Sequence, residues 1–149
     1  MKEIVNAIAA KHKKNGIDVY TPATIQDISL FEKKIGFALP VDFVTFYTTC
    51  NGLGCNEDIF NIIPLADIMC YSTNYGANWF YFAEYMIYSD MWGLRLNATG
   101  SYEIFNGGNP TLILTSSMKE FLNHYLTGNV FDPGGLYDWQ ERKLKEKSL

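Results

Sequence analysis

The hydrophobic pattern of this sequence changes its period along the chain. In residues 25–35 and 117–128, apolar side chains recur at steps of three and four, which is typical of amphipathic helices. From Ile59 to Leu114 that period is lost, and short aromatic and β-branched runs alternate with turn residues. The runs follow one another too closely for parallel crossovers, which favours antiparallel pairing. The pattern predicts one α+β domain over residues 1–149, with an antiparallel sheet of about five to six strands flanked by N-terminal and C-terminal helices.

Start and stop signals indicate two helices near the N-terminus. The first can extend to about Lys14. The second can be capped by Thr21, or by Thr24 with Asp27 three residues later. Gly36 is placed to end it in the left-handed conformation.

A third helix is expected directly after the second. Pro40 suits a first helical position because its φ is already fixed near the helical value. Asn51 and Gly52 supply a stop signal, and the short connection predicts that the two helices pack closely, with Leu39 at the joint. The apolar positions of this helix are Phe43, Phe46, Tyr47 and Cys50.

The central segment is expected to form the sheet, and helices are expected to follow it. Ser117 with Glu120 is a capping box for a helix that Gly128 ends, and a last, charged helix can run from Leu136 to Lys147. A short helix is expected at 65–71. The predicted strands are 59–63, 79–82, 85–88, 92–96, 102–105 and 111–114.

Several classes of protein are disfavoured by composition. No apolar run is long enough to span a membrane and no signal peptide is evident, so a cytoplasmic location is expected. Cys50, Cys55 and Cys70 form no paired-cysteine pattern, and His12 and His124 have no companions at ligand spacing, so neither a metal nor another cofactor is predicted. No catalytic motif is present, which indicates that the chain is not an enzyme.

Charge is distributed unevenly along the chain. Between Lys34 and Lys119 there are seven acidic residues and one basic residue, Arg95, so this segment has a net charge of −6. Such a segment repels phosphate backbones and attracts basic partners, so we expect a basic protein partner and no nucleic acid. The same carboxylates could instead only solvate a surface.

Aromatic and acidic residues gather in the predicted strands. Because strand neighbours point to opposite faces, some of the rings must point away from the helices. Exposed rings bordered by acids are typical of binding hot spots, although small domains also use such rings in their cores. Tyr81 belongs to this group of rings. The predicted partner-binding residues are Asp58, Trp79, Glu84, Tyr85, Tyr88, Asp90 and Trp92.

One segment of the sequence resembles a known signature. It runs from Ile28 to Tyr47 and is followed by Asn51-Gly52, and it consists of a helix with a central glutamate, a glycine, "LP", two aromatic residues and "NG". This pattern resembles the Smi/Knr-type cell-wall-regulator branch of the SUKH superfamily, over about residues 20 to 128. The residues of the motif are Phe31, Glu32, Gly36, Leu39, Pro40, Phe43, Phe46, Asn51 and Gly52.

The resemblance implies a single α+β domain that does not catalyse. Bacterial members are typically immunity proteins that neutralise a cognate toxin, often a nuclease, of polymorphic or contact-dependent systems, whereas the fungal branch regulates cell-wall assembly. The single-domain length resembles the bacterial type, so toxin binding is the leading hypothesis and a regulatory or scaffold module is the alternative. We expect Glu32 to be a structural cap or surface pair rather than a ligand contact. The oligomeric state, monomer or weak dimer, stays open.

Overall fold

The computed structural model describes residues 2–13, 17–55 and 59–148. The described strands form a six-stranded antiparallel sheet in the order β1-β2-β3-β4-β5-β6, a meander that follows the chain. The strands are β1 (Ile17–Val19), β2 (Leu53–Cys55), β3 (Phe60–Ile62), β4 (Trp79–Tyr85), β5 (Asp90–Leu96) and β6 (Tyr102–Asn106). The helices are α1 (Lys2–Lys13), α2 (Ile25–Ile35), α3 (Val41–Thr49), α4 (Leu65–Cys70), the 3-10 helix η1 (Ser72–Asn74), α5 (Met118–Gly128) and α6 (Leu136–Ser148).

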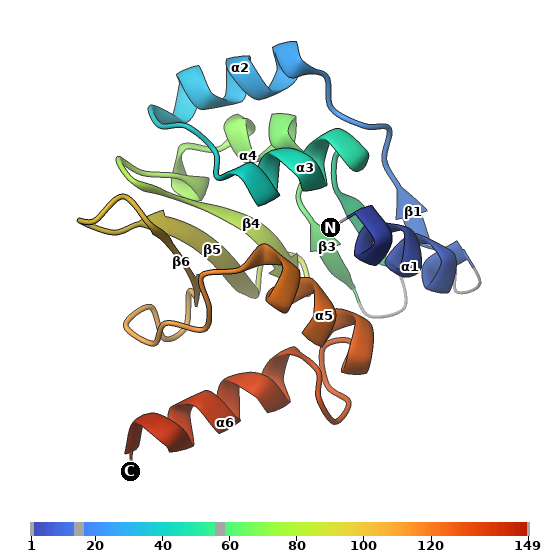
Figure 1. The fold of residues 1–149 in the computed structure, drawn as a ribbon, viewed down its shortest axis with the longest axis vertical. Coiled ribbons are helices and arrows are strands. Elements are labelled where there is room, and N and C mark those ends of the chain that lie inside the picture. Colours follow the sequence, from blue (N-terminus) through green and yellow to red (C-terminus); the bar gives the residue numbers. More distant parts are fainter. Residues whose placement is uncertain (1, 14–16, 56–58, 149) are drawn as a thin grey trace.

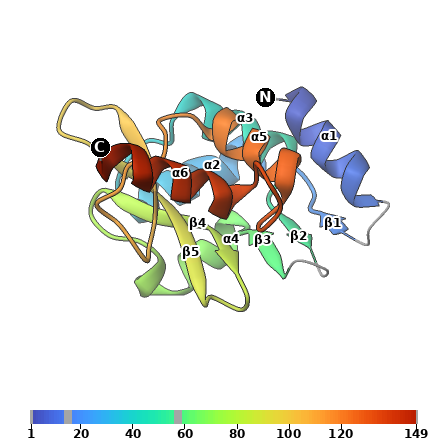
Figure 2. The same ribbon diagram turned by 90° about the horizontal axis from the view of Figure 1, so that it is seen from below.

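Most of the helices form one layer on one face of the sheet, which we call the inner face. Helices α1, α3 and α5 contact one another, α6 packs beside α5, and α2 contacts α4 (Figure 1). Figure 2 shows α3, α5 and α6 together above the sheet. This arrangement confirms the predicted α+β class. None of the helices in the described ranges has the length and apolar character that a membrane span requires.

Aromatic side chains hold the helix layer to the sheet. The ring of Phe43 meets Phe82 edge to face at 5.1 Å, and Phe82 meets Phe121 at 5.0 Å. Phe31 meets Phe80 in the same geometry at 5.2 Å. Such pairs add about 0.5–1.5 kcal/mol each beyond the burial of their area. The core therefore fixes which face of β4 points inward.

The predicted capping residues are confirmed for α2 and α5. Thr24 accepts a hydrogen bond from the backbone N–H of Asp27, and the Asp27 carboxylate accepts one from the N–H of Thr24. Ser117 likewise accepts from the N–H of Glu120. Each cap satisfies a backbone donor that a helix start otherwise leaves free.

The signature residues join the α2–α3 pair to the sheet. Glu32 accepts a hydrogen bond from the backbone N–H of Leu39 at 2.6 Å, which places it in the structural role expected for it. Asn51 accepts from the N–H of Leu65 and so caps α4 from outside that helix. Gly52 has φ +95°, and a Cβ there would lie 2.5 Å from the carbonyl oxygen of Ile62, so only glycine fits.

Two predicted strands are wrong and two real ones were not predicted. Of the predicted strand 85–88, only Tyr85 belongs to β4, and residues 86–88 lie in the β4–β5 turn. Residues 111–114 form no strand, although Thr115 makes an isolated bridge to Ile104. Strands β1 and β2 were missed because each is only three residues long and lacks a clear alternation.

A β-bulge in β4 changes which side chains face outward. Tyr81 pairs with Gly93 of β5, but Ala83 pairs with Trp92, so Phe82 is the extra residue. Beyond the bulge the alternation shifts by one position. Glu84 therefore points to the outer face of the sheet and Tyr85 to the inner face, the reverse of what simple alternation from Phe80 gives.

Candidate functional site

The outer face of the sheet, opposite the helix layer, carries a row of aromatic side chains. Trp79 and Tyr81 of β4 lie with their ring centroids 5.0 Å apart. Tyr81 in turn lies 6.1 Å from Phe105 of β6. These rings come from β4 and β6, and they meet across β5 because Gly93, which pairs with both Tyr81 and Phe105, has no side chain. Trp79 and Tyr81, two of the rings in the predicted group, are half-buried in this row, and Phe105, which the sequence analysis did not include, is buried beneath them.

Three adjoining hollows follow this row, and together we call them the outer groove. The first hollow, of about 230 Å³, includes Trp79 and Arg95 in its wall and shares Tyr81 with the second. The second, of about 440 Å³, shares Tyr88 with the third, which measures about 190 Å³. The second hollow is also lined by Tyr71, Thr73, Asn74 and Met91. The third hollow is also lined by Tyr20, Asn61, Ile63, Pro64, Asp67 and Glu84.

Glu84 is a buried carboxylate in the wall of the third hollow. It is only 4% exposed, and its two oxygens accept hydrogen bonds from the Asn61 side chain and, at 2.8 Å, from the backbone N–H of Tyr88. Both donors are neutral. The exposed carboxylate of Asp67, on α4, lines the same hollow.

The phenol of Tyr88 responds to this negative environment. Its pKa is raised above the ordinary value by partial burial and then by the nearby charges of Glu84 and Asp67. Both causes disfavour the phenolate. Tyr88 therefore presents a neutral ring to a wall that carries two carboxylates.

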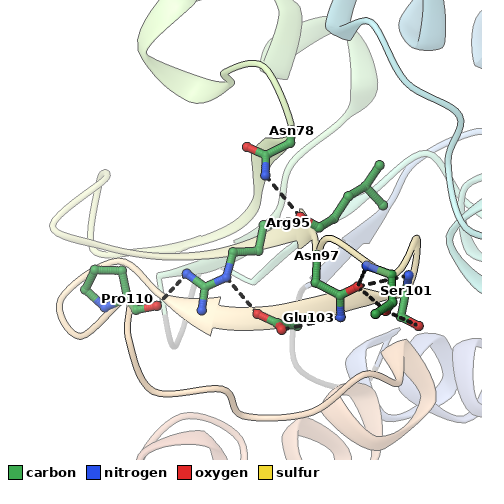
Figure 3. A network of polar contacts seen from close by, with 8 residues as sticks. Asn78, Arg95, Asn97, Ser101, Glu103 and Pro110 are labelled. Carbon is green, nitrogen blue, oxygen red and sulfur yellow. Dashed lines mark hydrogen bonds and ion pairs between the residues drawn. The ribbon is translucent and has the colours of Figure 1, made fainter.

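The one basic residue of the central segment does not neutralise this wall. Arg95 donates from Nε to Glu103 at 2.9 Å and from a terminal nitrogen to the carbonyl of Pro110 (Figure 3). Its guanidinium also lies 4.7 Å from the centroid of the Phe105 ring. Arg95 is thus committed to the β5–β6 end of the outer groove, and the other end keeps its negative charge.

The β4–β5 turn forms an apolar tip beside the outer groove. Met86, Ile87 and Tyr88 all have positive φ, between 53° and 64°, although none is glycine. Ile87 is 82% exposed and Met86 is 48% exposed. A β-branched residue at positive φ is a strong outlier, and such strain clusters at functional sites. The sequence did not mark this turn, because Tyr85-Met86-Ile87-Tyr88 has the composition of a strand.

The structure separates the predicted partner-binding residues into two groups. Trp79, Glu84 and Tyr88 line the outer groove. Trp92 is fully buried on the inner face, where its ring packs against Phe60 and Phe121, so its expected exposure is wrong.

Tyr85 and Asp90 also belong to the inner face. The ring of Tyr85 packs on Phe131 at 5.3 Å, because the bulge turns it inward. Asp90 accepts hydrogen bonds from Asn106 and from the Tyr137 hydroxyl, and burial followed by this contact raises the pKa of Tyr137. Asp90 therefore fastens α6 to the sheet. Asp58 lies outside the described residues.

Several carboxylates of the acidic segment have structural roles. Asp42 accepts from the Tyr102 hydroxyl and from the backbone N–H of Met118, which holds the start of α5 against α3. Glu103 pairs with Arg95. The negative surface predicted from charge counting is consequently concentrated near Asp67 and Glu84, within the part of the acidic segment that the structure describes.

Histidine and cysteine contribute no cluster in the described chain. His124 stacks on Trp139 at 4.3 Å, and its Nδ1 contacts the carbonyl of Gly134 at 3.0 Å, so it joins α5 to α6. Cys50 is buried, whereas Cys70 is exposed, so only one of these two thiols is in the core. No group of three or more potential metal ligands occurs among the residues described.

The fold and this surface define a small α+β domain with an aromatic, partly acidic groove on the outer face of its sheet. The sequence profile of the SMI1 / KNR4 family (SUKH-1) matches residues 22–124, from just before α2 into α5. The chain belongs to this family, as the resemblance predicted. Comparison with curated proteins finds no significant match.

Proposed function

We propose that this protein is an immunity protein that binds and neutralises a cognate bacterial toxin, without catalysis of its own. The proposal rests on family membership together with the outer groove. The observation that carries it is the combination of an aromatic floor with two carboxylates, Asp67 and Glu84, that form no ion pair among the described residues. That combination favours a basic polypeptide over a nucleic acid.

The outer groove has the features of a binding hot spot. Trp79, Tyr81 and Tyr88 offer rings, and aromatic residues carry much of the energy at protein interfaces. The apolar tip adds a contiguous exposed patch of Met86, Ile87 and Tyr88. Asp67 and Glu84 supply a negative field that would raise the rate of encounter with a positively charged domain. A toxin domain that binds nucleic acid is expected to carry such a charge.

The experiment is a growth assay with the gene next to this one. If that gene encodes a toxic domain, its expression in a bacterial host should arrest growth, and co-expression of this chain should restore growth. A Trp79→Ala Ile87→Asn variant that folds normally should restore growth poorly. Arrested growth in the presence of the wild-type chain, with no complex between the purified proteins, would contradict the proposal. A neighbourhood of cell-wall synthesis genes would instead favour the regulatory module.

A further inference from the structure

The third hollow of the outer groove contains a buried charge that the described chain leaves unpaired. The ion pairs among the described residues join Arg95 to Glu103 and Arg142 to Asp138, and neither involves Glu84. Removing a carboxylate from water is costly unless a cation or sufficient hydrogen bonds compensate it. Within the described ranges, Glu84 accepts hydrogen bonds from neutral donors only, so no compensating charge comes from this part of the chain.

Glu84 also keeps unused acceptor capacity. A carboxylate offers about four lone-pair positions, and Asn61 and the Tyr88 N–H occupy one on each oxygen. The side chain lines the hollow together with Asp67, so a donor entering from solvent would meet two carboxylates. Pairing of this donor with Glu84, which is buried, would contribute a large free energy of binding. Pairing with Asp67, which is exposed, would contribute a small one.

The size of the third hollow and its rings restrict what can enter it. At about 190 Å³ it is smaller than the roughly 300–1,000 Å³ of small-molecule sites. Tyr20 and Tyr88 border it, and the Tyr20 ring reaches over the sheet because Gly54 has no side chain: a Cβ there would lie 2.9 Å from the Tyr20 hydroxyl. Aromatic walls beside carboxylates suit a planar, weakly hydrated guanidinium better than an ammonium ion.

We propose that the hollow formed by Tyr20, Asn61, Asp67, Glu84 and Tyr88 is a recognition pocket for a single arginine side chain of the partner protein. The inference rests on the proposed function, since it names the group by which the partner is held. Glu84 accepts from the guanidinium at the base of the pocket, and Asp67 contributes at its rim. The Tyr88 backbone, fixed by its hydrogen bond to Glu84, couples the pocket to the apolar tip.

The test uses the isolated protein and a free arginine probe, so it does not need the toxin. Nα-acetyl-arginine N-methylamide is titrated into isotopically labelled protein, and the Tyr88 backbone amide and Asn61 side-chain amide are followed by NMR. The corresponding citrulline derivative, which has nearly the same shape and no charge, is the control probe. We expect saturable shifts at millimolar arginine probe and binding at least tenfold weaker for citrulline.

Two variants assign the binding to the pocket. Glu84→Gln preserves the shape, and a flip of the Asn61 amide can restore its hydrogen bond, so we expect a folded protein with affinity for the arginine probe reduced at least tenfold. Asp67→Asn changes an exposed side chain and should reduce the affinity for the arginine probe by about two- to fivefold. If Glu84→Gln does not fold, Asp67→Asn and Tyr88→Leu together test the pocket.

Equal shifts with both probes would overturn the proposal that the third hollow binds an arginine side chain. Arginine binding that is unchanged in Glu84→Gln would overturn it as well. That result would leave the growth assay unaffected, because toxin neutralisation does not require this particular contact. Failure of the growth assay together with charge-selective arginine binding would reject the immunity role and keep the pocket. The two proposals therefore fail separately.

Discussion

The backbone N–H of Tyr88 lies 2.8 Å from a carboxylate oxygen of Glu84, so the β4–β5 turn is closed by a buried side chain of its own hairpin. The second oxygen accepts from Asn61 on β3. The bulge at Phe82 makes this possible, because it directs Glu84 to the outer face. One carboxylate thus joins the floor of the outer groove to its exposed tip.

Removing this carboxylate should destabilise the fold, whereas removing only its charge should not. Glu84→Ala leaves the Tyr88 N–H and the Asn61 amide without an acceptor, and we expect a loss of about 1–3 kcal/mol in the free energy of unfolding. Glu84→Gln should be within about 1 kcal/mol of wild type in its free energy of unfolding, because no cation in the described part of the chain pairs with Glu84. Urea denaturation distinguishes the two. Equal losses in both variants would show that Glu84 is stabilised by a charge partner.

The apolar tip should matter for binding and not for stability. Ile87→Asn replaces a β-branched residue at φ 53° with one that tolerates this conformation, so stability should be unchanged or higher by about 1 kcal/mol. Partner affinity, measured by calorimetry, should fall at least tenfold. Val41→Asn is the matched control, since Val41 is also 82% exposed but lies at the start of α3. Similar affinity losses in both variants would contradict a specific role for the tip.

The two tryptophans predicted to share one surface should behave differently. Trp92→Ala removes a fully buried ring and should cost about 3–5 kcal/mol of stability. Trp79→Ala, on the outer face, should cost about 1 kcal/mol or less and should weaken partner binding. Thermal denaturation and calorimetry measure the two effects. A large stability loss for Trp79→Ala would place that ring in the core.

Alkaline pH should destabilise the protein through Cys50. Burial raises the pKa of this thiol from 9.0 to about 11. The unfolded state therefore loses its proton first, so the stabilisation is complete below pH 9 and disappears as the pH rises to about 11. When the pH rises from about 8 to about 10.5, the free energy of unfolding of the wild type should fall by about 2 kcal/mol more than that of Cys50→Ala. Denaturation curves at the two pH values test this, and parallel losses would mean that the thiol titrates normally. Comparison with the variant cancels the titration of buried tyrosines such as Tyr47, whose pKa burial also raises.

Local chemistry explains which parts of the fold could be predicted. Thr24 with Asp27, and Ser117 with Glu120, are caps that act within four residues, so sequence spacing is enough to place α2 and α5. Gly36 ends α2 at φ +92°, as its residue type indicates. The helices and the order of the central strands followed from such signals.

The groove depended on features that residue type does not reveal. The bulge at Phe82 reverses the faces of Glu84 and Tyr85, and strand alternation alone cannot locate it. The β4–β5 turn has the composition of a strand, because non-glycine residues occupy its three consecutive positions of positive φ. Asp67 and Tyr20 reach the pocket through tertiary packing alone. The prediction therefore identified an aromatic and acidic surface but placed Trp92, Tyr85 and Asp90 on the wrong face.

The most direct test of the account is hydrogen–deuterium exchange on the complex between this protein and the toxic domain that the growth assay identifies. Binding in the outer groove should slow exchange in residues 71–75 and 86–91 and leave α1 and α6 unchanged. Protection confined to α6 and residues 109–114, which enclose a separate cavity of about 340 Å³, would contradict it.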